Sequence, residues 1–108
     1  MRAHFSEALR RYGTPLVLQR NGEETALRGF LQSVRAAGTH KVRREELGAR
    51  LPGEAVYLGP PEIPVDGGVL LRGTERWRVR RWETVYVADE AVYLWAALTR
   101  EGEVDSFV

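Results

Sequence analysis

The chain has 108 residues and a net charge of +1, with 44% hydrophobic and 29% charged residues. This length predicts one domain over residues 1–108, and the composition is typical of a soluble globular protein and excludes a polycation or a disordered chain. No stretch approaches the roughly 18 apolar residues of a membrane span, and the absence of cysteine excludes disulfides and thiolate metal sites. We therefore expect a protein that is made in the cytoplasm and does not contact a membrane.

Residues 2–12 are predicted to form a short amphipathic helix. The apolar side chains that recur at the spacing of one helical face are Phe5, Ala8, Leu9 and Tyr12. Gly13 and Pro15 end this pattern. Because so short a helix is marginal by itself, we expect it to pack against the rest of the chain.

Two strands follow, joined by a tight turn. Residues 15–20 and 25–34 have the composition of strands, and the Asn21-Gly22 dipeptide between them readily takes the positive φ angles of a hairpin turn. Gly29, in the middle of the second strand, indicates a bulge or a bend like those at barrel corners.

Further strands are predicted after a polar interruption, at residues 54–59, 69–73, 76–87 and 91–100. The prolines and glycines of residues 60–68 predict an extended crossing with a turn, since proline cannot serve a central strand. Roughly six short strands, one short helix and one long loop predict a mainly β fold, a small barrel or a sandwich. The side chains that we expect in its interior are Leu16, Leu18, Leu31, Val56, Leu58, Leu70, Val79, Val85, Leu94 and Leu98.

The last two predicted strands have apolar residues on both faces. In the first of them Trp77 and Val79 share a face, and one extra residue near Arg80 and Arg81, a β-bulge, would place Trp82 on that same face. In the second strand one face carries Val92, Leu94, Ala96 and Leu98, and the other carries Tyr93, Trp95, Ala97 and Thr99.

Two interpretations account for a hairpin that is apolar on both faces, and they can share one surface. In the first, one face lines the barrel interior and the N-terminal helix covers the other. In the second, part of the outer face is a subunit interface, where tryptophan, tyrosine and arginine are enriched. The candidate interface residues are Trp82, Tyr86, Tyr93 and Trp95.

Two segments are basic. Residues 35–53 carry Arg35, Lys41, Arg43, Arg44 and Arg50 against Glu45 and Glu46, which gives +5 − 2 = +3 with His40 neutral. A connection this long is usually functional or disordered, so we expect it to be mobile. Residues 72–81 carry five arginines against Glu75, or +4. Either segment could bind nucleic acid, but charge on a strand edge also serves simply to prevent aggregation.

Signals for an enzyme are weak. His4 and His40 lack the spacing of metal ligands, and no serine lies in a nucleophile-elbow context. No glycine-rich stretch matches a phosphate-binding loop. We therefore predict no catalytic residue, no metal and no cofactor.

The order of elements nevertheless resembles that of a known family. The segments "YGTPLVLQRNG" (12–22), "GFLQSV" (29–34) and "VYLGPPEIPVDGGVLLRGTERWRVRRWETVYVADEAVYLWAALTR" (56–100) resemble the small head-to-tail connector proteins of tailed phages and prophages, called stopper or head-completion proteins. The resemblance covers nearly the whole chain and lies in element order and scattered residues.

The resemblance implies a small, closed or partly open β-barrel that is not an enzyme. Such subunits assemble into a homo-oligomeric ring at the virion neck, beneath portal and adaptor proteins and above tail proteins, and they are made in the cytoplasm of the bacterial host. The long loop of the family faces the channel and helps to retain packaged DNA. Here that role would fall to Arg35, Lys41, Arg43, Arg44 and Arg50.

Other classes of function stay open at this point. A tail-terminator ring subunit is the alternative within phages, and a small nucleic-acid-binding barrel is the alternative outside them. The latter should bind nucleic acid as a free subunit, with an affinity that falls steeply with salt. A connector subunit should bind free DNA poorly, because one loop contacts few phosphates.

Overall fold

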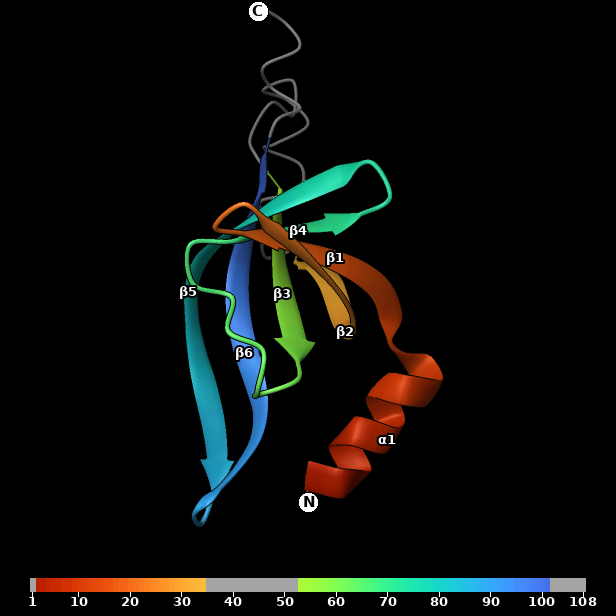
Figure 1. Cartoon of the computed structure of the whole chain (residues 1–108), viewed down its shortest axis with the longest axis vertical. Coiled ribbons are helices and arrows are strands. Elements are labelled where there is room, and N and C mark those ends of the chain that lie inside the picture. The colour runs from red at the N-terminus through yellow and green to blue at the C-terminus, as the bar shows by residue number, and fades with distance from the viewer. Residues whose placement is uncertain (1, 35–52, 102–108) are drawn as a thin grey trace, which may run out of the picture.

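The computed structural model of the protein describes residues 2–34 and 53–101. Its elements are the helix α1 (Arg2–Tyr12) and the strands β1 (Thr14–Arg20), β2 (Glu23–Val34), β3 (Glu54–Gly59), β4 (Val69–Arg72), β5 (Glu75–Val87) and β6 (Glu90–Glu101). The strands form a closed barrel in the order β1-β2-β3-β6-β5-β4, in which every neighbouring pair is antiparallel (Figure 1). The predicted mainly β fold with one short helix is confirmed, and it is a barrel.

The predicted hairpin turn lies where the sequence placed it, and β2 changes its partner strand at Gly29. Asn21 and Gly22 have φ angles of 54° and 81°, which lets β1 and β2 form a tight hairpin. Gly29 is the last β2 residue paired with β1, and Phe30 is the first paired with β3. Gly29 therefore lies where β2 passes from one neighbouring strand to the other in the closed barrel.

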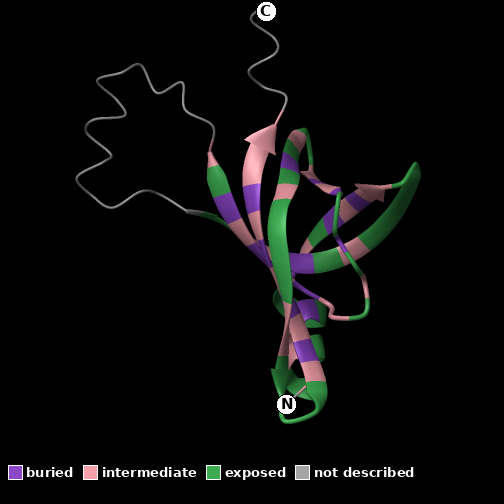
Figure 2. Ribbon diagram, turned by 90° about the vertical axis from the view of Figure 1, so that its left-hand side faces the viewer, coloured by how far each residue is buried: buried purple, intermediate pink, exposed green. Residues whose placement is uncertain are grey.

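The core fills the interior of the barrel. Its buried members are Leu16, Leu18, Ala55, Tyr57, Val65, Leu70, Trp77, Leu94, Ala96 and Leu98. Figure 2 shows buried residues alternating with less buried ones along β6, as expected for a strand with one inward face. Of the predicted interior residues, Leu16, Leu18, Leu70, Leu94 and Leu98 are confirmed as buried, and Leu31 and Val79 are partly buried against the same core.

The predicted orientation of β3 was wrong. Ala55 and Tyr57 point into the barrel, whereas Val56 and Leu58 alternate with them on the outer face and are only half-buried. The predicted interior position of Val85 is also wrong, because Val85 pairs with Tyr93 and shares its outward-facing side of the sheet. The prediction placed aliphatic residues inside and tyrosine outside, but the barrel instead accommodates one large ring between small neighbours.

Two glycines make room for that ring. A Cβ at Gly29 would meet Cε1 of Tyr57 at 2.5 Å, and a Cβ at Gly59 would overlap the hydroxyl end of the same ring. The Tyr57 side chain is fully buried, and its hydroxyl has no hydrogen-bond partner among the described residues. Burial, together with the nearby charge of Glu62, raises the pKa of this hydroxyl above its ordinary value.

We expect Tyr57→Phe to raise the free energy of unfolding by about 1 kcal/mol, because the folded state no longer buries an unpaired hydroxyl. The unfolded tyrosine ionises near pH 10 while the buried one stays neutral, so the native chain should lose stability above that pH and the variant should lose less. Urea unfolding at pH 7 and pH 10.5 measures both effects. Tyr86→Phe is the matched control, since Tyr86 is 61% exposed. A destabilised Tyr57→Phe would show that the hydroxyl has a partner.

The helix α1 covers part of the outer face of the barrel. The ring of Phe5 lies 6.2 Å from that of Phe30 and 5.3 Å from that of Tyr93, measured between centroids. Leu9, another residue of the predicted apolar face, is buried. Packing of the helix on this side confirms the first interpretation of the apolar outer face for the surface around Tyr93.

The β5–β6 hairpin extends beyond the rest of the barrel. β4 pairs only with residues up to Arg78 of β5, and β3 pairs only with β6 from Leu94 onward. The stretch from Arg80 to Tyr93 therefore forms a two-stranded ribbon, seen at the lower end of Figure 1. Within the described ranges, residues 80–87 of β5 have no strand on the side away from β6, so this edge of the sheet is open.

Candidate binding surface on the β5–β6 hairpin

A β-bulge begins the ribbon. Val79 pairs with Leu98 and Arg81 pairs with Ala97, so Arg80 is an extra residue in β5. In such a bulge two residues of one strand lie opposite one residue of the other. The predicted bulge at Arg80 and Arg81 is confirmed, and it places two neighbouring arginines opposite the small Ala97.

The two arginines line a hollow in the outer face of the barrel, which we call the basic hollow. It has a volume of about 400 Å³ and is lined by Glu54, Ala55, Val56, Arg80, Arg81, Trp95, Ala97, Leu98 and Thr99. Nη1 of Arg80 donates a hydrogen bond to Oγ1 of Thr99 at 3.1 Å. The guanidinium of Arg81 lies 5.3 Å from the centre of the Trp95 ring, which is within cation–π range.

Other arginines of β4 and β5 are neutralised by carboxylates. Arg72 contacts Glu75 at 2.7 Å, and Glu101 lies 3.4 Å from Arg76 and 2.6 Å from Arg78. Burial opposes ionisation of Glu75, but hydrogen bonds from the Trp77 indole and from Arg72 outweigh it and lower the pKa of this carboxyl. These contacts neutralise the arginines of the basic segment 72–81 up to Arg78.

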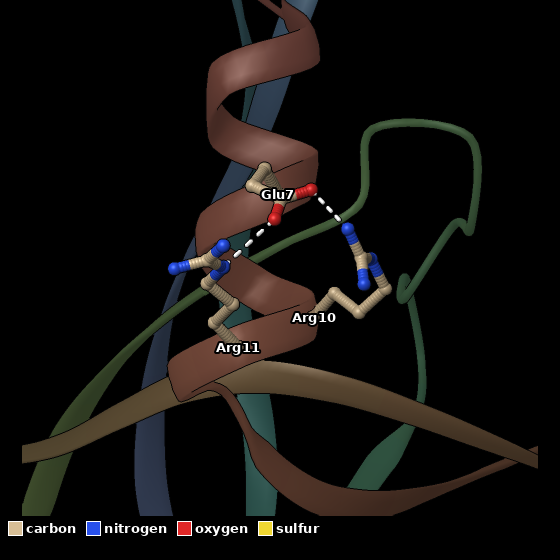
Figure 3. Close-up of polar contacts among 3 residues, drawn as sticks. All are labelled: Glu7, Arg10 and Arg11. Carbon is tan, nitrogen blue, oxygen red and sulfur yellow. Dashed lines mark hydrogen bonds and ion pairs between the residues drawn. The ribbon is translucent and has the colours of Figure 1, made fainter.

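The arginines of the helix are paired as well. Glu7 lies between Arg10 and Arg11, and its Oε2 accepts a hydrogen bond of 2.8 Å from Nε of Arg11 (Figure 3). The bonds from Arg11 and Arg10 lower the pKa of Glu7, as expected for a carboxylate between two cations. The three residues lie within about one turn of the helix, and the two exposed arginines share one carboxylate.

Arg80 and Arg81 differ from these arginines. Both are exposed, and no carboxylate lies within ion-pair distance of either in the described part of the chain. Glu54 lines the same hollow but forms no ion pair with them. The basic hollow thus presents two guanidinium groups beside an aromatic wall, an arrangement that suits a carboxylate or phosphate group from another molecule.

Apolar side chains extend the surface along the ribbon. Trp82, Tyr86 and Val87 are 42%, 61% and 44% exposed, and with Tyr12 they are the exposed large hydrophobic residues of the described ranges. Trp82 lies opposite Ala96 and so faces the same side as the core, but it lies where the ribbon has no opposing strands. An open strand edge with exposed aromatics is a template for pairing with another chain.

The four interface candidates do not form one patch. Trp82 and Tyr86 are exposed, whereas the Tyr93 ring packs on Phe5 and Trp95 lies under Arg81. Register places Trp95 opposite Glu83, on the face away from Trp82. The predicted channel residues Arg35, Lys41, Arg43, Arg44 and Arg50, and the predicted mobility of the loop that carries them, lie outside the described residues.

Some features of the surface were not predicted from sequence. The partner of Arg76 and Arg78, Glu101, lies one residue beyond the predicted end of the last strand. Extending the alternation of β6 by that residue would have placed Glu101 across from Arg76. Arg80 and Arg81 line the same hollow because of the register at the bulge. The sequence pattern indicated the bulge but not this register.

The described ranges contain neither a cluster of three acidic, histidine or cysteine side chains suited to a metal ion nor a helix that is long and apolar enough to cross a membrane. Comparison of the chain with protein-family models, with curated proteins and with solved structures finds no match in any of the three.

Proposed function

We propose that the chain is a structural subunit of a phage head–tail connector ring, which joins a DNA-filled head to its tail. The observation that carries the assembly role is the β5–β6 ribbon, which within the described ranges has an open strand edge, exposed aromatics and two arginines without an ion-pair partner. The resemblance of its sequence segments to stopper proteins supports the connector role, and a small barrel is compatible with it.

In this proposal the subunit has no catalytic role and contacts its own copies, portal or adaptor proteins and tail proteins at the virion neck. The basic residues Arg43, Arg44 and Arg50 would face packaged DNA from many subunits at once. Repeated around a ring, they would line a channel with charge of one sign. A tail-terminator ring would use the same assembly surface at the other side of the neck.

A small nucleic-acid-binding barrel is the second candidate function. It is favoured by one observation, the stacking of Arg81 over Trp95 beside Arg80, since a phosphate and a base could occupy the hollow together. Titration of the free subunit with single-stranded DNA at several salt concentrations separates the two candidates. Tight binding with a steep salt dependence would favour this alternative, and weak binding favours the connector.

Deleting the gene from the phage or prophage that carries it should yield filled heads that lack tails or lose their DNA. A plasmid copy should restore plaque formation, and a copy with Arg43, Arg44 and Arg50 all changed to glutamine should restore it poorly. Plaque titre and electron microscopy of the lysate measure both results. Portal and capsid genes should lie upstream and tail genes downstream. A metabolic operon around the gene, or normal titres after deletion, would contradict the proposal.

A further inference from the structure

A second hollow, of opposite charge, lies at the β1–β2 turn. It has a volume of about 370 Å³ and is lined by Gln19, Arg20, Asn21, Gly22, Glu23, Glu24, Gly67 and Val69. Arg20 donates two hydrogen bonds to Asp66. Its Nη2 bonds to Oδ1 of Asp66 at 3.1 Å, and its Nε bonds to the main-chain oxygen of Asp66 at 3.0 Å. Glu24 accepts a hydrogen bond from the neutral amide of Gln19, and neither Glu23 nor Glu24 has a cationic partner within the described ranges.

The turn that carries these carboxylates is exposed. Residues 21 to 24 are all exposed, and the left-handed backbone of Asn21 and Gly22 holds the chain in a tight hairpin. A rigid turn loses little conformational freedom when it is bound. Glu23 and Glu24 are the first two residues of β2 and pair with Arg20 and Gln19, so their carboxylates project from the two faces of one fixed hairpin end, which we call the acidic turn.

We propose that the acidic turn of one copy of this chain binds in the basic hollow of the next copy. The proposal rests on the assembly role proposed above and names the contact that makes it. The two carboxylates at the hairpin end would meet two guanidinium groups, and within the described ranges neither the two carboxylates nor the two arginines form an ion pair of their own. Charge-assisted hydrogen bonds between guanidinium and carboxylate are short, directional and often bidentate.

The contact is head-to-tail, because its two halves are different surfaces. The basic hollow is formed by β3, β5 and β6, and the acidic turn joins β1 to β2. Docking of a hollow on another hollow, or of a turn on another turn, would bring like charges together. A heterologous contact leaves one unused hollow and one unused turn at the ends of every chain of copies, and it stops only when a ring closes.

Charge reversal with mixing tests the contact directly. The variant Arg80→Glu/Arg81→Glu and the variant Glu23→Arg/Glu24→Arg should each associate at least about tenfold more weakly than the native chain. Mixed in equal amounts they should associate again, because the acidic hollow of the first accepts the basic turn of the second and the basic hollow of the second accepts the acidic turn of the first. A single chain with all four changes should also recover. Sedimentation velocity over a concentration series measures association, and thermal unfolding checks that each variant folds.

A cross-link supplies an independent readout, because the native chain has no cysteine. Glu23→Cys combined with Arg81→Cys in one chain should give a ladder of oxidised dimers, trimers and larger species. Either change alone should give little cross-linked product. Dimers alone from both single-cysteine variants would indicate a symmetric contact and would overturn the proposal.

The remaining outcomes are distinct from a failure of the connector role. Native chains that form rings while both reversed variants also form rings would overturn this contact but leave the assembly role standing. A native chain that stays monomeric at millimolar concentration would overturn this contact, and the deletion experiment described above would decide the connector role separately. Loss of single-stranded DNA binding in Arg80→Glu/Arg81→Glu, with native association retained, would instead assign the basic hollow to nucleic acid.

Discussion

Truncation of Leu98 to alanine is expected to lower the free energy of unfolding by about 2–5 kcal/mol. Leu98 is 2% exposed and belongs to the core of the barrel, opposite Val79 of β5 and Ala55 of β3. Removing its isopropyl group would leave a cavity beside strands that are fixed by pairing on both sides and so cannot easily close around it. Leu94→Ala should have an effect of the same size, because Leu94 is 1% exposed in the same strand.

Urea unfolding measures the change in the free energy of unfolding, with one slope of free energy against urea concentration shared by all variants. Val87→Ala is the control, since Val87 is 44% exposed near the tip of the ribbon and its truncation should stay within about 0.5 kcal/mol. Val56→Ala should fall between the two, because Val56 is half-buried on the outer face. A loss below about 0.5 kcal/mol at both leucines would mean that β6 presents its other face to the interior.

The local elements of this fold could be predicted from sequence because each depends on residues close together in the chain. The apolar spacing of residues 2–12 predicts the helix, and Asn21-Gly22 predicts the first hairpin turn, which the structure shows with positive φ at both residues. Alternation in β6 predicts its inward face. The bulge at Arg80 followed from the same reasoning, since without it the apolar residues of β5 would change sides.

The orientation of β3 could not be predicted in this way because it depends on a contact across the barrel. Val56 and Leu58 are better interior residues by composition, yet Tyr57 lies inside. What decides the orientation is space, which Gly29 of β2 and Gly59 at the end of β3 provide for one ring. The sequence predicts a bulge or bend at Gly29, whereas the closeness of Gly29 to an aromatic side chain is a tertiary feature.

The candidate binding surface was likewise predicted only in part, because some of its features depend on contacts between distant segments. The sequence identifies the hairpin as unusual and predicts four of its aromatic residues as interface candidates. Their division between two faces, with Tyr93 under the helix and Trp82 exposed on the ribbon, depends on how far β3 and β4 extend along it. How far a strand is paired depends on the length of its neighbouring strands, and the alternation of residues within one strand does not reveal that length.

Replacement of Gly59 by alanine is expected to destabilise the barrel by about 1–3 kcal/mol, because the new methyl group overlaps the Tyr57 ring. The ring has little room to move away, since even a Cβ added at Gly29 on the neighbouring strand would lie only 2.5 Å from its other edge. The effect should depend on the ring itself. In a Tyr57→Leu background, where the ring is absent, Gly59→Ala should cost clearly less, and the difference is the coupling energy of a double-mutant cycle.

Gly53→Ala is the matched control. A Cβ at Gly53 would lie 3.8 Å from Trp77 and 3.9 Å from Arg100, which is ordinary contact, so that change should stay within about 0.5 kcal/mol. Urea unfolding of the two single variants at Gly53 and Gly59, of Tyr57→Leu and of the double variant completes the cycle. Equal costs for Gly59→Ala in both backgrounds would mean that Gly59 is needed for its backbone and not for the ring. A large coupling would identify Tyr57 as the side chain that fixes which face of β3 points into the barrel.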